Sequence, residues 1–134
     1  MIEAEVKMLL VEDNEDFRGR VSYLLRERFS SMQISEVGTC SDALKIMNDH
    51  TQNLIFMDIN LPDGMGLDLT KTITEKFSDS VVVILSVNDM PEYREASFNC
   101  GASHFFSKGN FSFQEVVGFI EDFLSGKVRR NKLH

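Results

Sequence analysis

Three short, almost entirely apolar segments constrain the fold of this chain more than any other feature. They span residues 6–11, 54–57 and 81–85 and consist largely of Val, Ile, Leu and Met. Runs of this length that are apolar on both faces are typical of buried strands in a parallel sheet, because helices cover both sides of such a sheet. The sequence therefore predicts a sheet whose central strands are fully enclosed.

Helical patterns alternate with strand patterns along the chain. Weaker strand candidates at 33–37 and 103–107 raise the number of expected strands to five. Between and after them, apolar residues recur at the spacing of one helix face. The positions that mark the expected helices are Phe17, Val21, Leu24, Leu25 and Phe29; Ala43, Leu44 and Met47; Leu69, Ile73 and Phe77; the segment that ends near Gly101; and Phe113, Val116, Val117, Ile120, Phe123 and Leu124. This alternation predicts an α/β fold, a doubly wound five-stranded parallel sheet with helices on both faces.

Polar residues and glycine mark three expected helix ends. Ser41 is placed to cap the N-terminus of the second helix. Asp89 followed by Glu92 resembles a capping box at the start of the fourth helix, where Pro91 is tolerated in the first turn. Gly101 is expected to end that helix, since glycine readily adopts the left-handed conformation.

The overall composition limits the function classes open to the chain. Its 134 residues suit one domain, which we expect to span 1–126, followed by a polar tail or the start of a linker at 127–134. The formal net charge of −7 argues against direct nucleic-acid binding, which requires clustered Lys and Arg. No apolar run reaches the ~18 residues of a membrane span, no signal peptide is recognisable, and Cys40 and Cys100 form no disulfide or metal pattern. We therefore expect a cytoplasmic protein.

Polar side chains follow four of the strand candidates at the point where each strand ends. Glu12 and Asp13 follow the first strand, Asp58 ends the third, and Ser86 and Lys108 follow the fourth and fifth. The carboxyl ends of parallel strands lie at one edge of the sheet, so we expect these groups to share one crevice. Three carboxylates that lie close together repel one another, and a hard divalent ion neutralises them. Mg²⁺ suits such oxygen ligands, and the sequence therefore predicts a magnesium site.

The other polar groups at this edge suit phosphate chemistry. Lys108 is a point charge that can bind a phosphoryl group, and the Ser86 hydroxyl can donate a hydrogen bond to another phosphate oxygen. A carboxylate can act as a nucleophile and form an aspartyl phosphate. We therefore expect phosphorylation of Asp58, which stands at the tip of a buried strand shortly before a Pro62-Asp63-Gly64 turn.

From about Lys7 to Leu124 the sequence resembles the receiver domains of two-component response regulators. No single motif is specific, but five occur in the expected order and spacing. They are Val11-Glu12-Asp13-Asn14, the block from Met57 to Gly64, Ile84-Leu85-Ser86, Gly101-Ala102 and Phe105-Phe106-Ser107-Lys108. The resemblance implies a flavodoxin-like fold with strand order 2-1-3-4-5.

The resemblance also implies roles for the acidic residues. Asp58 is expected to accept a phosphoryl group from a sensor histidine kinase or a phosphotransfer protein. Glu12, Asp13, Asp58 and the backbone carbonyl of Asn60 are expected to hold Mg²⁺. By the same resemblance the domain is a signalling phosphoacceptor and not an enzyme, although it assists its own phosphorylation and dephosphorylation.

Recognition of the phosphate and switching are assigned by the same resemblance. Ser86 and Lys108 are expected to bind the phosphoryl group, and Phe105 and Ser86 to switch the surface formed by the fourth helix, fifth strand and fifth helix. Serine and phenylalanine stand here where threonine and tyrosine are more frequent. Val87 and Asn88 are expected to tune access to the site, and the bulk of Val87 to lengthen the life of the phosphorylated state.

The output of the chain is left open by the sequence. Only eight residues follow Gly126, too few for a helix-turn-helix module. The chain is therefore either a stand-alone receiver that acts on a downstream protein partner or part of a larger, transcription-regulating protein whose output domain is missing here. A homodimer through the switching surface is a further alternative.

Three other functions remain as alternatives. A degenerate receiver would bind partners without being phosphorylated, but the intact acidic set argues against it. An aspartate-nucleophile phosphatase requires a second aspartate two residues after the nucleophile, where this chain has Asn60. A flavin-binding domain requires a phosphate loop after the first strand, where Glu12 and Asp13 would repel the phosphate.

Overall fold

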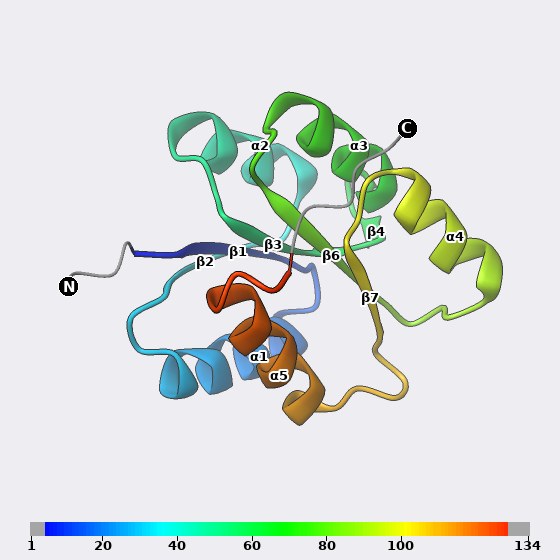
Figure 1. Cartoon of the computed structure of the whole chain (residues 1–134). Coiled ribbons are helices and arrows are strands. Elements are labelled where there is room, and N and C mark those ends of the chain that lie inside the picture. Colours follow the sequence, from blue (N-terminus) through cyan, green and yellow to red (C-terminus); the bar gives the residue numbers. More distant parts are fainter. Residues whose placement is uncertain (1–4, 129–134) are drawn as a thin grey trace.

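A five-stranded parallel sheet forms the centre of the molecule (Figure 1). The structure is a computed structural model and describes residues 5–128. The strand order is β2-β1-β3-β6-β7, where β6 and β7 are the fourth and fifth strands of the main sheet. The strands are β1 (Lys7–Val11), β2 (Gln33–Val37), β3 (Leu54–Asp58), β6 (Val81–Ser86) and β7 (His104–Ser107). This arrangement confirms the predicted doubly wound fold and the predicted order 2-1-3-4-5.

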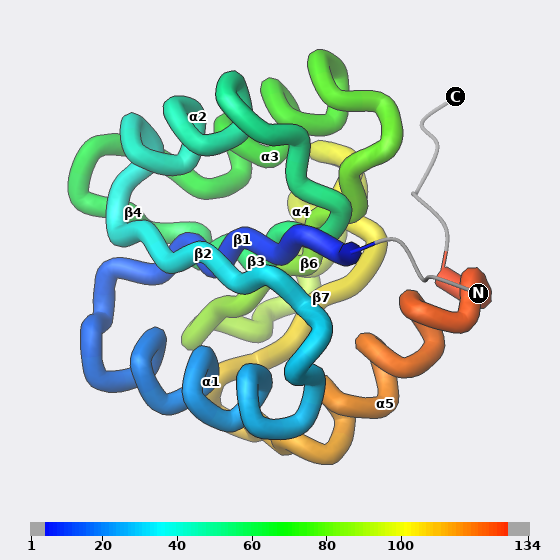
Figure 2. The backbone as a smooth tube through the Cα atoms, turned by 90° about the vertical axis from the view of Figure 1, so that its left-hand side faces the viewer, coloured from blue at the N-terminus to red at the C-terminus, as the bar shows by residue number. Residues whose placement is uncertain are grey.

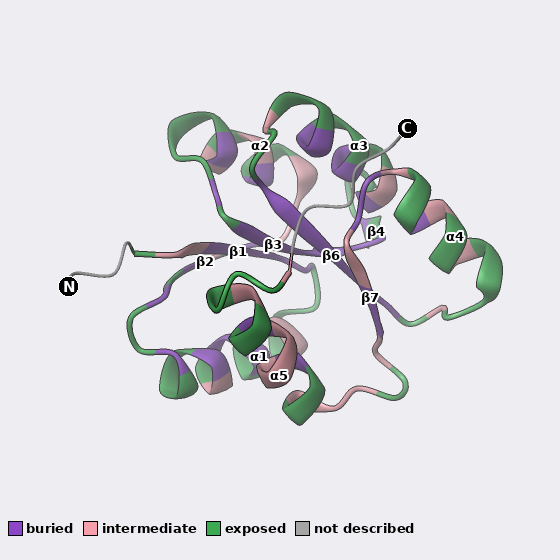
Figure 3. Cartoon of the chain, in the orientation of Figure 1, coloured by how far each residue is buried: buried purple, intermediate pink, exposed green. Residues whose placement is uncertain are grey.

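Five helices cover the two faces of this sheet. They are α1 (Glu15–Arg28), α2 (Cys40–Asp49), α3 (Gly66–Lys76), α4 (Pro91–Asn99) and α5 (Phe113–Leu124). Helices α1 and α5 lie on one face, and α2, α3 and α4 lie on the other, as Figures 1 and 2 show from two sides. Because the crossovers place helices on both faces, the central strands lie between two layers and become fully buried (Figure 3).

Alternate side chains of each strand supply two separate cores. Met8 and Leu10 of β1 point toward the α1 and α5 face, where they pack in one cluster with Leu25. Leu9 and Val11 point the other way and pack with side chains of α2 and α3. The two cores hold the sheet rigidly from both sides, which fixes the positions of its strand ends.

A short antiparallel ribbon follows β3. Strands β4 (Asn60–Leu61) and β5 (Gly64–Met65) pair on either side of the turn at Pro62 and Asp63. The sequence predicted a turn here but not the ribbon, because two-residue strands carry no hydrophobic periodicity. The ribbon leads directly into α3.

Two of the three predicted helix ends are wrong. Thr39, not Ser41, caps α2: its side chain accepts a hydrogen bond from the backbone of Asp42, and Ser41 lies inside the first turn. The N-cap of α4 is Met90, which has no side-chain capping bond, so Asp89 and Glu92 form no capping box.

The third predicted helix end is confirmed. Helix α4 ends at Asn99, and Gly101 follows with a φ of 103°. Pro91 favours the residue directly before it as the cap of α4, because proline fits the first helical position and leaves no N–H to satisfy there.

The ends of the chain lie mostly outside the described residues. Residues 1–4 and 129–134 fall there, and with them most of the predicted tail. Val128, the last described residue, packs against the core cluster on the α1 and α5 face. Within residues 5–128, no helix is long and apolar enough to cross a membrane.

Candidate functional site at the carboxyl edge of the sheet

The parallel strands bring the predicted polar groups to one edge of the sheet. Asp58, the last residue of β3, pairs in register with Leu85, one residue before the end of β6. Ser86 at the end of β6 pairs with the last residue of β7, directly before Lys108. The register of these strands therefore brings Asp58, Ser86 and Lys108 to the same edge of the sheet.

Three carboxylates gather at this edge. Oxygen atoms of Glu12, Asp13 and Asp58 all lie within 4.8 Å of one another. Glu12 and Asp58 are buried, with 0% and 7% of their surface exposed, whereas Asp13 is exposed to solvent. A cluster with two buried acids and one exposed acid is open to ions from one side.

Burial and repulsion make it costly to ionise Asp58. Burial is the larger cause, and the negative charge of Glu12 adds to it, so that the pKa of Asp58 rises from 3.8 to about 7. The positive charge of Lys108 acts in the opposite direction. A cation beside these carboxylates would restore the ionised form that a nucleophile requires.

Lys108 lies over the acidic cluster. Its Nζ forms a close ion pair with Oε1 of Glu12 and lies 3.5 Å from Oδ2 of Asp58. The same nitrogen lies 4.9 Å from the centre of the Phe17 ring, a cation–π contact that α1 supplies. The backbone N–H of Lys108 donates to the carbonyl of Ser86 over 2.7 Å, which fixes the end of β7 against β6.

Ser86 is buried at the end of β6, 2% exposed. Its hydroxyl oxygen accepts a hydrogen bond from the backbone N–H of Asn88, and the Asn88 side chain accepts one from Met90. These two bonds order the loop between β6 and α4. Val87, in contrast, points into solvent, with 71% of its surface exposed.

Gly66 allows the chain to pass directly under the nucleophile candidate. A Cβ atom at this position would overlap the carbonyl oxygen of Asp58. The N–H of Gly66 donates to the carbonyl of Ile59 over 2.5 Å, which pulls the start of α3 against the end of β3. Asn60, the first residue of the ribbon, therefore lies in a loop that is fixed at both ends.

Phe105, the predicted switch residue, lies inside the molecule. It belongs to β7 and is 4% exposed. The guanidinium carbon of Arg94 on α4 lies 4.6 Å from the centre of its ring. Phe105 thus packs beneath α4.

The donor atoms of this edge fit a hard divalent cation. Three carboxylates provide only oxygen ligands, as Mg²⁺ prefers. Oε1 of Glu12 is buried, has no hydrogen-bond partner among the described residues, and forms an ion pair with the Lys108 ammonium group. A buried carboxylate oxygen with unused acceptor capacity, facing two other carboxylates, is a suitable ligand for a cation.

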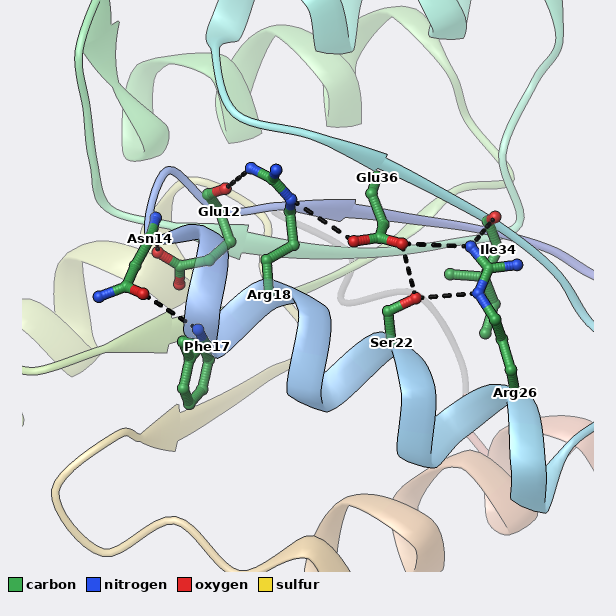
Figure 4. Close-up of polar contacts among 8 residues, drawn as sticks. All are labelled: Glu12, Asn14, Phe17, Arg18, Ser22, Arg26, Ile34 and Glu36. Carbon is green, nitrogen blue, oxygen red and sulfur yellow. Dashed lines mark hydrogen bonds and ion pairs between the residues drawn. The ribbon is translucent and has the colours of Figure 1, made fainter.

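Sequence patterns did not predict two polar contacts beside the acidic cluster. Arg18 of α1 donates from Nη1 to the backbone carbonyl of Glu12 over 2.7 Å (Figure 4). The carboxylate of Asp63 in the ribbon accepts hydrogen bonds from the backbone N–H groups of Cys40 and Ser41 at the start of α2. Neither contact has a local spacing signal, because each joins segments that only the folded sheet brings together.

Cys40 and Cys100 are both free cysteines. Burial and the nearby charge of Asp63 raise the pKa of Cys40 to about 11. Burial also raises the pKa of Cys100. Neither thiol is close to the ionised form at neutral pH.

Comparison of sequences supports the resemblance. The family model for the response regulator receiver domain matches residues 8–121. Response regulator UvrY of Escherichia coli K12 is 27% identical over 122 residues, which cover 91% of this chain and 56% of that protein. The transcriptional regulatory protein DegU of Brevibacillus brevis is 24% identical over 79% of this chain and 45% of its own length. The chain therefore spans about half the length of the curated relatives it matches.

Comparison of structures supports the fold. The response regulator DrrB, an OmpR/PhoB homologue from Thermotoga maritima, matches with a TM-score of 0.83 at 21% identity, over 94% of this chain and 55% of that one. A CheY-like receiver domain protein from Methanospirillum hungatei matches with a TM-score of 0.83 at 19% identity, over 92% and 97%. At these identities the likeness is one of fold.

Proposed function

Because this chain belongs to the response regulator receiver domain family, we propose that Asp58 accepts a phosphoryl group from a sensor histidine kinase or a phosphotransfer protein. The observation that carries this proposal is the position of Asp58. It is a buried carboxylate at a strand end, with two further acids and the Lys108 ammonium group around it. Response regulators are signalling proteins, and phosphorylation of Asp58 is the signal that this chain would receive.

Glu12, Asp13 and Asp58, with the backbone carbonyl of Asn60, would hold Mg²⁺. When bound, the ion neutralises the carboxylates and the negative charge of the phosphoryl group. The chain would contribute the ligands from the loop after β1, the last residue of β3 and the start of β4, and it keeps Glu12 and Asp58 out of bulk water. The depth of these two acids strengthens their interaction with any cation at the site.

Transfer of the phosphoryl group requires an ionised Asp58. One of its carboxylate oxygens forms the new bond to phosphorus while the bond from phosphorus to the donor breaks, and the donor leaves with that electron pair. Lys108, 3.5 Å from Asp58, would neutralise a transferred phosphoryl oxygen. The Ser86 hydroxyl would donate a hydrogen bond to another phosphoryl oxygen.

We further propose that Ser86 and Phe105 link phosphorylation to the surface formed by α4, β7 and α5. The Ser86 hydroxyl oxygen now accepts from Asn88, so its movement toward a phosphate would release the loop before α4. Phe105 lies under Arg94 of that helix and would repack with it. Val87 and Asn88, in the same loop, would tune access to the site.

The output would be passed on through protein contacts. The receiver would span 1–126, with 127–134 as a tail or linker, and the matched relatives extend well beyond it. Either a downstream protein or an output domain of a longer, transcription-regulating protein would recognise the altered surface, in the cytoplasm, and a homodimer through the same surface is an alternative. Direct binding of nucleic acid by this chain is not part of the proposal, since the net charge is −7.

Mass spectrometry after incubation with acetyl phosphate and Mg²⁺ tests the phosphorylation site. The wild-type protein should gain the mass of one phosphoryl group, and Asp58→Asn should gain none. Asp79→Asn is the matched control, because it removes an exposed carboxylate in the loop before β6, at the opposite end of that strand from Ser86, and should leave the gain intact. If Asp58→Asn is still phosphorylated, another residue is the acceptor; if the wild type gains no mass, the chain is a degenerate receiver.

A further inference from the structure

We infer that Arg18 is a positioning residue for the acidic cluster: it holds the backbone of Glu12 in place and thereby raises the affinity of the site for a divalent cation. The inference deepens the function proposed above and rests on it. Arg18 does not belong to the cluster; its side chain bonds to the Glu12 carbonyl and pairs with Glu36. Its effect would be exerted through Glu12 alone.

Arg18 joins three segments of the chain. From α1, its Nη1 donates to the Glu12 carbonyl over 2.7 Å, and its Nε lies 3.5 Å from Oε1 of Glu36 in β2 (Figure 4). The side chain is largely buried, 20% exposed. One guanidinium group therefore connects the loop after β1 with the adjacent edge strand.

The space for this guanidinium is provided by Gly38. A Cβ atom there would lie 3.1 Å from Nη1 of Arg18 and 3.7 Å from the carbonyl oxygen of Glu12. Any larger residue at 38 would crowd the place where Arg18 meets the loop. Glycine at position 38, directly after β2, thus leaves room for the long side chain of Arg18 on α1.

Both backbone polar groups of Glu12 are fixed by this arrangement. Its N–H donates to the Val37 carbonyl over 3.0 Å, and its carbonyl accepts from Arg18. Its side chain also accepts from the N–H of Asn14. Glu12 is held on three sides before any ion arrives.

Fixing Glu12 matters because the cluster repels itself. The charge of Glu12 disfavours the ionised form of Asp58, so without restraint the two carboxylates would gain by moving apart. A restraint formed during folding keeps them close, so ion binding does not have to bring them together. The Arg18 bond to the Glu12 carbonyl is such a restraint. Hydrogen bonds that orient a metal ligand commonly change metal affinity by 10–100-fold.

Arg26 supplies a matched control on the same helix. It also carries one positive charge, contacts Glu36 through Nη2 at 3.3 Å, and donates to a backbone carbonyl, that of Ile34, over 2.8 Å. It thus ties α1 to β2 as Arg18 does, but farther from the acidic cluster (Figure 4). A role limited to packing α1 on the sheet would make the two arginines equivalent with respect to ion binding.

The sign of the expected effect separates positioning from simple electrostatics. Removing a positive charge near a cation site should strengthen cation binding, because it removes a repulsion. Loss of a positioning residue should weaken it. Weaker binding by Arg18→Met would therefore oppose the electrostatic effect and could not result from it.

Isothermal titration with Mg²⁺, at fixed pH and ionic strength, tests the inference. Relative to wild type, Arg18→Met should raise the Kd about 10-fold, and Arg26→Met should leave it within about twofold. Arg18→Lys, which can reach Glu36 or the Glu12 carbonyl but not both, should fall between. Urea unfolding of each variant shows that it is folded at the titration temperature.

Equal Kd changes in Arg18→Met and Arg26→Met, or an unchanged or lower Kd in Arg18→Met, would overturn the inference and leave the proposed function intact. A wild-type protein that takes up no Mg²⁺ would overturn both. Arg18→Lys keeps the test decisive if Arg18→Met does not fold, because its Kd should still exceed that of wild type.

Discussion

At the scale of single residues, the dominant feature is a carboxylate that the fold makes costly to ionise. Asp58 is buried beside Glu12, and Lys108 only partly compensates their repulsion. Under the function proposed above, a cation and a phosphoryl group bound at the same place would remove this cost. In the metal-free protein the cost should be measurable as a loss of stability.

The stability of the metal-free protein should fall as pH rises from about 4 to 7. The pKa of Asp58 is raised from 3.8 to about 7 in the folded state, so the folded protein holds the proton more tightly than the unfolded chain. The stabilisation is complete below the unfolded pKa and is lost as pH rises through the folded pKa. Asp58→Asn should not show this loss. The difference between its free energy of unfolding and that of wild type should therefore rise by about 2 kcal/mol from pH 5 to pH 8.

Thermal unfolding with EDTA at the two pH values measures this difference. The difference in Tm between Asp58→Asn and wild type should be several degrees larger at pH 8 than at pH 5. Addition of Mg²⁺ should raise the Tm of wild type at pH 8, because the ion binds the folded state. A difference that does not change with pH would show that Asp58 is not the titrating group.

Gly66→Ala should destabilise the protein by about 3 kcal/mol or more, since the new Cβ would overlap the Asp58 carbonyl oxygen. Gly19→Ala and Gly118→Ala are the controls. Both glycines lie in helices with nothing within 4 Å of an added Cβ, so alanine should stabilise there by up to about 1 kcal/mol. Urea unfolding of the three variants gives the comparison. If Gly66→Ala leaves the free energy of unfolding unchanged, residue 66 does not lie this close to the Asp58 carbonyl.

The sequence was most informative for residues at strand ends. Glu12, Asp58, Ser86 and Lys108 could be grouped in advance because parallel strands end at one edge, a rule that needs no knowledge of side-chain direction. Arg18 could not be found in this way. It lies on an exposed helix pattern, and its partner is a backbone carbonyl that no side-chain pattern reveals.

At the scale of elements, the turn of the short ribbon β4–β5 is tied to helix α2. Asp63 accepts from the N–H groups of Cys40 and Ser41, at distances of 2.8 and 3.0 Å. Its carboxylate thus serves the N-terminus of a helix to which it does not belong, where backbone N–H groups lack partners. The tie holds the loop that begins with Asn60.

Asp63→Asn should lower the Tm near pH 7, and this effect should shrink as the pH falls below the ordinary Asp pKa of 3.8. The two backbone hydrogen bonds lower the pKa of Asp63, so this stabilisation exists above the unfolded pKa and is lost as pH falls through the folded one. Once the wild-type carboxyl is protonated, it differs little from an amide. Thermal unfolding of both proteins across this range tests the tie, and equal Tm values at pH 7 would contradict it.

Elements were predictable where they were long and periodic. The stripe from Phe113 to Leu124 predicted α5 with its observed bounds. Helix starts were less predictable, since several polar residues near a start can each serve as a cap. For α2 the sequence pattern pointed to Ser41, but the N-cap is Thr39, whose backbone has the extended conformation of a capping residue.

At the scale of the whole molecule, the site belongs to neither of the two cores but to the rim between them. The loop after β1 leads to α1 on one face, and the loop after β3 leads to α3 on the other. Lys108 contacts Phe17 of the first face and acids from both loops. A charge change at this rim can therefore reach both helical layers.

Phosphorylation should change hydrogen exchange mainly in the loop 87–90 and in α4, β7 and α5, and leave β1 and β3 unaffected. The physical reason is that Ser86 and Phe105 contact that part of the molecule, whereas the central strands are enclosed by two cores. Ser86→Ala should still be phosphorylated but should lose most of the change. Hydrogen exchange measured by mass spectrometry tests this prediction. If phosphorylation alters exchange in Ser86→Ala as much as in wild type, Ser86 does not link the site to this surface.

The protonated state of the two native thiols makes selective chemical labelling practical. With a pKa of about 11, Cys40 at neutral pH has on the order of a hundredfold less thiolate than an ordinary exposed cysteine. A cysteine introduced by Met90→Cys would lie at the half-exposed N-cap of α4, where a helix start favours the thiolate. A fluorophore or spin label would attach there first, so motion of α4 could be followed without removing Cys40 or Cys100.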